Sequence, residues 1–130
     1  MALVLVVEDN PTTSKLVQFA LTAAGFLVVT AATGRAALET LGEIKPDVII
    51  QDLMLPDIDA FDLLRRMRSV PTVHEVPIIA FSAFTEMLDQ ARNSEATFDE
   101  CVSKPIEPSK LIAIVRRHLT PLGSKVCSLH

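Results

Sequence analysis

The sequence contains no tryptophan and no tyrosine, and it has only two cysteines, Cys101 and Cys127. Two cysteines are too few for the disulfide framework of a small secreted domain or for a complete four-ligand zinc site. Basic residues are in the minority, since 12 Lys and Arg stand against 16 Asp and Glu and give a net charge of −4. Such a chain lacks the basic surface that binds nucleic acid phosphates. We therefore expect a reduced, cytoplasmic protein that does not bind nucleic acid directly.

One uncharged run, residues 16–34, approaches the length that spans a bilayer. Its first part is rich in Ala and Leu, as helices prefer, and after Gly25 it becomes β-branched, as strands prefer. This change of character predicts a buried helix and a buried strand rather than a membrane span. No signal peptide is expected, because Met1 is followed directly by a strand-like run without basic residues.

The chain has 130 residues, 49% of them hydrophobic, which is enough to bury the core of one domain. We expect that domain over residues 1–120, and a C-terminal tail or truncated linker over 121–130. Apolar runs predict strands at residues 3–7, 26–30, 48–51, 76–81 and 101–103. Helical patterns lie between and after them, at about 11–24, 34–43, 60–69, 86–93 and 108–119. This alternation predicts an α/β fold with a parallel sheet covered by helices on both faces.

Polar residues follow four of the five predicted strands, at the point where each strand ends. These residues are Glu8 and Asp9, Asp52, Ser82, and Lys104. Taken singly, each has an ordinary interpretation as a helix cap, a loop residue or a solvated lysine. Together they lie at the carboxyl edge of a parallel sheet, where ligands of open α/β sheets bind. The pattern therefore indicates one site.

The residue types at this edge suit phosphoryl chemistry. Neighbouring carboxylates raise each other's pKa, and a divalent cation such as Mg²⁺ relieves that repulsion. An ionised aspartate beside the cation can attack phosphorus and carry an aspartyl-phosphate. A lysine and a hydroxyl can stabilise the phosphoryl oxygens by charge and hydrogen bonding.

Four motifs, in this order and spacing, resemble the receiver domain of two-component response regulators over residues 2–120. The motifs are Glu8-Asp9, Asp52-Leu-Met-Leu-Pro56-Asp57, Phe81-Ser82-Ala83 and Lys104-Pro105. The resemblance implies a doubly wound, flavodoxin-like sheet of five parallel strands, in the order 2-1-3-4-5, flanked by five helices. It also implies a cis peptide between Lys104 and Pro105.

The resemblance further implies a phosphorylation-dependent signalling switch, which is not an enzyme beyond weak self-phosphatase activity. Asp52 would accept a phosphoryl group from a phosphohistidine of a sensor histidine kinase or a histidine phosphotransfer protein. Phosphorylation would change the surface that docks an output partner protein or a missing output domain.

The same resemblance assigns the remaining site residues. Asp9, Asp52 and the backbone carbonyl of Met54 would bind Mg²⁺, or Mn²⁺, directly, and Glu8 would bind it through a water. Ser82 would move toward the phosphoryl group, and Lys104 would pair with it.

Bulky apolar residues stand two positions after the acceptor and two positions after the hydroxyl residue. These are Met54 and Phe84. In the family these positions influence how water reaches the aspartyl-phosphate, so we expect slow self-dephosphorylation.

The chain departs from the family at several positions. Cys101 stands where Tyr, Phe or His is usual, and its simplest role is that of a small buried hydrophobe. Gln51 replaces the usual apolar residue before the acceptor. Ala60 and Thr97 stand where glycine is common, so a positive φ there would be strained and the loops are expected to differ locally. Cys127 is expected to be exposed.

Three alternatives remain at this point. A pseudo-receiver that only binds partner proteins is compatible with Cys101, although the intact acidic set speaks against it. A phosphatase of the haloacid-dehalogenase type needs a second acid at the position of Met54. A flavodoxin-like electron carrier needs a hydroxyl-rich loop after the first strand, usually with aromatic residues beside the flavin. The sequence instead has Glu8-Asp9-Asn10-Pro11 after the first strand, and it has no Trp or Tyr.

Overall fold

The computed structural model describes residues 2–93 and 98–119. Five parallel strands form one sheet in the order β2-β1-β3-β4-β5, as the resemblance implies. The strands are β1 (Leu3–Val7), β2 (Leu27–Ala31), β3 (Val48–Asp52), β4 (Ile78–Ser82) and β5 (Glu100–Ser103). The helices are α1 (Pro11–Ala23), α2 (Gly34–Leu41), α3 (Ala60–Arg68), α4 (Thr85–Asn93) and α5 (Pro108–His118), with a 3₁₀ turn, η1 (Pro71–Val73), before β4. The predicted α/β fold is therefore confirmed.

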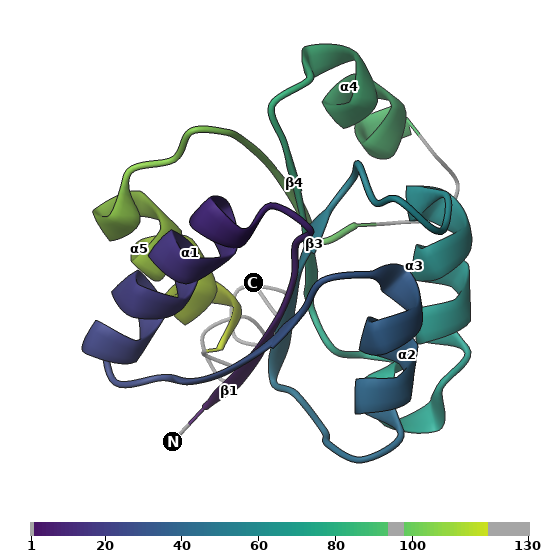
Figure 1. The fold of residues 1–130 in the computed structure, drawn as a ribbon, viewed down its shortest axis with the longest axis horizontal. Coiled ribbons are helices and arrows are strands. Elements are labelled where there is room, and N and C mark those ends of the chain that lie inside the picture. The colour runs from purple at the N-terminus through teal and green to yellow at the C-terminus, as the bar shows by residue number, and fades with distance from the viewer. Residues whose placement is uncertain (1, 94–97, 120–130) are drawn as a thin grey trace, which may run out of the picture.

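Helices cover both faces of the sheet, with α1 and α5 on one side and α2, α3 and α4 on the other (Figure 1). Successive strand residues point to opposite faces. In β1, Val4 and Val6 pack in the core under α1 and α5, whereas Leu5 and Val7 pack in the core under α2 and α3. Because both faces are buried, the central strands are continuous apolar runs rather than alternating ones.

The strand boundaries differ from the predicted ones by one or two residues. The predicted strand at 76–81 begins only at Ile78. Val76 is 9% exposed and belongs to the turn after η1, where its N–H donates to the carbonyl of Val73 at 3.1 Å. An apolar loop residue that packs on the core has the same pattern as a strand residue, so the sequence alone does not distinguish them.

The long uncharged run folds as α1 and β2, joined by a turn at Gly25, as predicted. The expectation that both elements are buried is wrong: α1 buries only Val17 and Leu21, and β2, at the edge of the sheet, buries only Ala31. Gly25 has a φ of +97°, which its lack of a Cβ permits. The helix begins after Asn10, whose side chain accepts hydrogen bonds from the N–H groups of Thr12 and Thr13. None of the helices in residues 2–93 and 98–119 is long and apolar enough to cross a membrane.

The loop after β3 accommodates Ala60 without strain. No residue other than glycine has a positive φ in the described part of the chain. Ala60 is the first residue of α3, and the preceding Asp59 caps this helix by accepting the N–H groups of Phe61 and Asp62. Thr97 and Cys127 lie outside the described residues.

The loop after β3 is also attached to α2. Each carboxylate oxygen of Asp57 accepts one backbone N–H at the start of α2, from Gly34 and from Arg35, both at 2.9 Å. Both hydrogen bonds lower the pKa of Asp57, and the bond from the N–H of Arg35 has the larger effect. Gly34 lies so close to this loop that a Cβ there would be 2.2 Å from Cγ2 of Ile58.

Replacing Gly34 with alanine should therefore destabilise the fold, by roughly 1–3 kcal/mol, because an added methyl group forces a packed neighbour to shift. Urea denaturation of Gly34→Ala against the wild type measures the loss. In an Ile58→Ala background, which removes the obstructing methyl group, the same substitution should cost clearly less. Equal costs in both backgrounds would contradict the steric explanation.

Candidate functional site

The carboxyl ends of β1, β3, β4 and β5 surround one cavity of about 440 Å³, which we call the acidic site. Its lining includes all the residues predicted for the site: Glu8, Asp9, Asp52, Met54, Ser82 and Lys104. Asn10, Pro11, Ala83 and Phe84 also line the cavity. From the sequence, Asn10 and Pro11 are expected only to start the first helix, and Phe84 only to affect dephosphorylation. Residues separated by almost the whole domain thus meet because parallel strands end at the same edge.

Three carboxylates in the acidic site can hold a metal ion. One oxygen each from Glu8, Asp9 and Asp52 lies within 4.8 Å of the others, and the described residues contain no other such group of three. Glu8 and Asp52 are buried, whereas Asp9 is exposed. Hard oxygen ligands with one side open to solvent fit Mg²⁺, which retains several waters. The N-cap of α1 is Asn10, whose side chain accepts the N–H groups of Thr12 and Thr13.

Lys104 lies between the acids. Its ammonium forms an ion pair with Oε1 of Glu8, and its Nζ is 3.4 Å from Oδ2 of Asp52. The same Nζ lies 5.1 Å from the centre of the Phe81 ring. The peptide bond between Lys104 and Pro105 is cis, as the resemblance implies. The pair of Lys104 with Glu8 does not follow from the resemblance, which implies only that Lys104 pairs with the phosphoryl group.

Asp52 has an unusual proton affinity. Burial raises its pKa to about 6, and the hydrogen bond and negative charge of Glu8 contribute in the same direction. The N–H of Met54, which donates to Oδ1 of Asp52 at 3.0 Å, and the charge of Lys104 act against this rise. Near neutral pH the carboxylate of Asp52 is therefore largely ionised, but its surroundings do not fully stabilise the negative charge. Such a carboxylate favours binding of a cation or attack on an electrophile.

This raised pKa predicts a pH-dependent stability without metal. Folded Asp52 holds its proton more tightly than the unfolded chain does, so its contribution to the free energy of unfolding decreases as the pH rises from 3.8 to about 6. Asp52→Asn should be more stable than the wild type above pH 6, and the difference should vanish below pH 4. Urea denaturation over this pH range in a chelating buffer measures it. A stability difference that does not change with pH would refute the prediction.

Ser82 ends β4 and is 1% exposed. Its Oγ accepts the N–H of Phe84 at 3.0 Å, which fixes the start of the following loop. The hydroxyl hydrogen remains available for donation, so Ser82 can serve as a hydrogen-bond donor at the edge of the acidic site.

Two apolar side chains form the rim of the acidic site. Met54 and Phe84 are 49% and 55% exposed, although both are large hydrophobic residues. They line the acidic site together with the carboxylates and also line a neighbouring groove at the start of α4. Their position can restrict the access of water to Asp52.

Two of the residues that depart from the family pattern, Gln51 and Cys101, lie in the sheet below the acidic site. Cys101 in β5 is partly buried, and this burial raises the pKa of its thiol. Gln51 in β3 is completely buried, and its Nε2 donates to the carbonyl of Ala60 at 3.0 Å. The predicted role of Cys101 as a small core residue fits its contact with the apolar cluster under α4.

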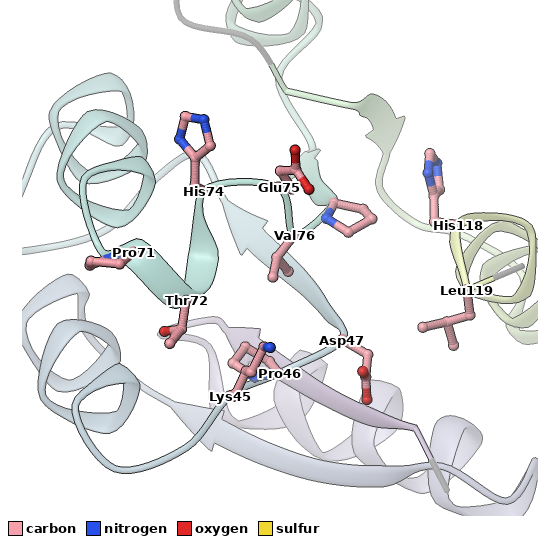
Figure 2. A pocket seen from close by; sticks show the side chains of 11 residues that line it. Lys45, Pro46, Asp47, Pro71, Thr72, His74, Glu75, Val76, His118 and Leu119 are labelled. Atoms are coloured by element: carbon pink, nitrogen blue, oxygen red, sulfur yellow. The ribbon is translucent and has the colours of Figure 1, made fainter. Parts of the chain in front are cut away.

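A second cavity, of about 580 Å³, lies at the opposite edge of the sheet, where β3 and β4 begin. Figure 2 shows the side chains of His74 and His118 well apart, on the segment before β4 and at the end of α5. The ring of His118 instead contacts Glu100, with Nε2 2.8 Å from Oε1. The described residues around this cavity include no convergent set of metal ligands.

Residues 4–116 match the response regulator receiver domain family. The chain is 31% identical over 115 residues to an uncharacterized protein of Leptolyngbya boryana, with 88% of each chain covered. It is 38% identical over 116 residues to the transcriptional regulatory protein KdpE of Mycobacterium tuberculosis, with 89% of this chain and 50% of that protein covered. The chain thus spans about half the length of several curated relatives that it matches.

Solved structures show the same relationship. The chemotaxis response regulator CheY4 of Vibrio cholerae has a TM-score of 0.83 and 30% identity, covering 92% of this chain and 99% of that chain. A second solved structure is the receiver domain of the sensor histidine kinase PA1611 from Pseudomonas aeruginosa, with a magnesium ion coordinated in its active-site cleft. It has a TM-score of 0.81 and 28% identity, and the match covers 91% of this chain and 97% of that chain. Because the family model matches residues 4–116 and the fold agrees with these solved structures, the chain belongs to the response regulator receiver domain family.

Proposed function

We propose that this domain is a signalling switch in which Asp52 accepts a phosphoryl group from a phosphohistidine. The observation that carries the proposal is the position of Asp52, a buried carboxylate with a raised pKa, between a lysine and two further acids. The donor would be a sensor histidine kinase or a histidine phosphotransfer protein. Membership of the receiver family supports this assignment.

In the transfer, a carboxylate oxygen of Asp52 attacks phosphorus while the bond from phosphorus to the imidazole nitrogen breaks. The leaving imidazole nitrogen retains the bonding electron pair and takes up a proton. Lys104, which is within 3.4 Å of Asp52, would shift from Glu8 toward the phosphoryl oxygens and stabilise their charge. Ser82 would donate its hydroxyl hydrogen to another phosphoryl oxygen.

Mg²⁺, or Mn²⁺, would be held by Asp9, Asp52 and the backbone carbonyl of Met54, with Glu8 acting through a water. When bound, the ion would neutralise the carboxylates and the incoming phosphoryl charge. The clustering of the Glu8, Asp9 and Asp52 carboxylates supports a cation at this site, and a related receiver domain has been solved with magnesium in its active-site cleft. Asp9, as the exposed acid, would remain accessible to the ion from solvent.

The output of the switch would be a changed surface that binds a partner protein or an attached output domain. Phosphorylation would act by stabilising one of two surface conformations more than the other. Curated relatives that are twice as long are transcriptional regulators, and this supports control of an attached or separate output module.

Incubation with Mg²⁺ and a small-molecule phosphodonor, followed by intact-mass spectrometry, tests the proposal. The wild type should gain the mass of one phosphoryl group, located on the peptide that contains Asp52. Chelation of the metal should strongly slow this gain, and so should Asp9→Asn. A wild-type chain that stays unmodified in the presence of Mg²⁺ would refute the proposed function.

The aspartyl-phosphate should decay slowly, because the bulky apolar side chains of Met54 and Phe84 line the acidic site and would hinder the approach of water to Asp52. Met54→Asn and Phe84→Glu should each speed up hydrolysis by roughly tenfold, since a polar side chain can position the attacking water. The phosphorylated fraction, followed by mass over time after removal of the donor, measures this rate. Leu16→Asn, which changes an exposed apolar residue far along α1, is the matched control. Unchanged decay in both rim variants would contradict the prediction.

A further inference from the structure

The loop between β3 and α3, residues 53–59, is anchored at both ends. At its start, the N–H of Met54 donates to Oδ1 of Asp52 at 3.0 Å. At its end, Asp59 caps α3. Because Met54 lines the acidic site, the position of this loop determines how Met54 lies relative to Asp52.

Asp57 attaches the middle of this loop to α2. Its two carboxylate oxygens accept the N–H groups of Gly34 and Arg35, each at 2.9 Å. Within the described residues, no other hydrogen bond ties residues 55–58 to another segment. A charged acceptor makes stronger hydrogen bonds than a neutral one, and the lowered pKa of Asp57 shows that these bonds stabilise its carboxylate. The two bonds therefore hold the loop against α2.

The start of α2 is a well-defined attachment point. The first N–H groups of an α-helix have no partners inside the helix, and Asp57 satisfies the first two of α2. The third, that of Ala36, donates to Oγ1 of Thr33 at 3.0 Å and is independent of the loop. The loop also packs closely on this helix end, because a Cβ on Gly34 would overlap the side chain of Ile58.

The connection from Asp57 back to Met54 is short and stiff. Only Leu55 and Pro56 lie between them. The ring of Pro56 fixes one backbone dihedral angle, and Leu55 packs on the core under α2 and α3. A displacement of Asp57 is therefore transmitted to Met54 rather than absorbed within the loop.

We infer that Asp57 is a positioning residue, which holds Met54 in place for a divalent cation in the acidic site through its two hydrogen bonds to α2. This inference rests on the proposed function, in which the backbone carbonyl of Met54 is a cation ligand. Removing a group that orients a metal ligand without touching the metal typically weakens metal binding by about 10–100-fold. Because such coupling is reciprocal, a bound cation should also strengthen the attachment of Asp57 to α2.

Titration of Mg²⁺ alone into the full chain, followed by isothermal titration calorimetry, tests the inference. Asp57→Ala, which removes the attachment, should weaken Mg²⁺ binding by about tenfold. Asp57→Asn should bind nearly as tightly as the wild type, because one amide oxygen can accept two helix N–H groups, as that of Asn10 does at the start of α1. An equal loss in both variants would assign the effect to the charge of Asp57 and overturn the inference, and so would an unchanged affinity in Asp57→Ala.

Thr33→Ala is the matched control, because it removes a hydrogen bond from the same turn of α2 without touching the loop. It should lower the urea concentration at which the protein unfolds but leave the Mg²⁺ affinity unchanged. If Thr33→Ala weakens Mg²⁺ binding as much as Asp57→Ala does, then Asp57 acts only as a helix cap and the inference is overturned.

Hydrogen exchange of the wild type covers the case in which Asp57→Ala does not fold. Saturation with Mg²⁺ should slow exchange at the N–H groups of Gly34 and Arg35 more than at that of Ala36. Equal changes at the three groups, or none, would overturn the inference while leaving the proposed function intact. A wild-type chain that binds no Mg²⁺ would overturn the inference together with the proposed cation site.

Discussion

Asp52→Asn should abolish phosphorylation by a small-molecule donor, so that the intact mass remains that of the unmodified chain over any practical incubation. The amide that replaces the carboxylate is a much poorer nucleophile and cannot form the aspartyl-phosphate. The variant should nevertheless fold, because asparagine has nearly the same shape as aspartate. The raised pKa of Asp52 also means that its negative charge destabilises the metal-free fold, and the variant removes this charge.

Asp62→Asn is the matched control for this experiment. Asp62 lies on α3, where its carboxylate is exposed and paired with Arg65. It should be phosphorylated like the wild type, because it does not line the acidic site. Persistent phosphorylation of Asp52→Asn would show that another residue accepts the phosphoryl group and would remove the basis of the proposed mechanism.

The central strands of the sheet were predictable because β1, β3 and β4 are buried on both faces. Val48, Ile49 and Ile50, for example, are all at most 1% exposed, so the apolar run and the strand coincide. Strand order did not follow from such runs and came from the resemblance to receiver domains. Boundaries were less predictable where loop residues pack on the core, as Val76 does before β4.

The membership of the acidic site was predictable for a geometric reason. Parallel strands end at one edge, so the polar residues at or just after the ends of β1, β3, β4 and β5 had to meet. Their pairing was not predictable, because side-chain conformations decide which acid Lys104 contacts, and Glu8 is 96 residues away in the chain. The attachment of Asp57 to α2 likewise depends on how loops and helices pack after the sheet has formed.

Lys104→Met should damage both stability and phosphorylation. Methionine keeps the apolar stem but removes the ammonium, and this leaves the carboxylate of Glu8, which is 3% exposed, without its ion-pair partner. Breaking a buried pair in this way should cost about 3 kcal/mol in the free energy of unfolding at pH 7. The loss of the positive charge beside Asp52 should slow phosphorylation by about 10²–10³-fold, since electrostatic stabilisation of the transferring group is lost.

Two comparisons separate these effects. Lys110→Met, an exposed lysine in the first turn of α5, should change neither the urea denaturation curve nor the phosphorylation rate appreciably. Glu8→Gln combined with Lys104→Met removes the unpaired charge, so the double variant should recover much of the stability but none of the lost rate. A Lys104→Met variant that is phosphorylated at the wild-type rate would show that the ammonium serves only to neutralise Glu8. Recovery of the rate together with the stability would instead assign the slow phosphorylation of Lys104→Met to its damaged fold.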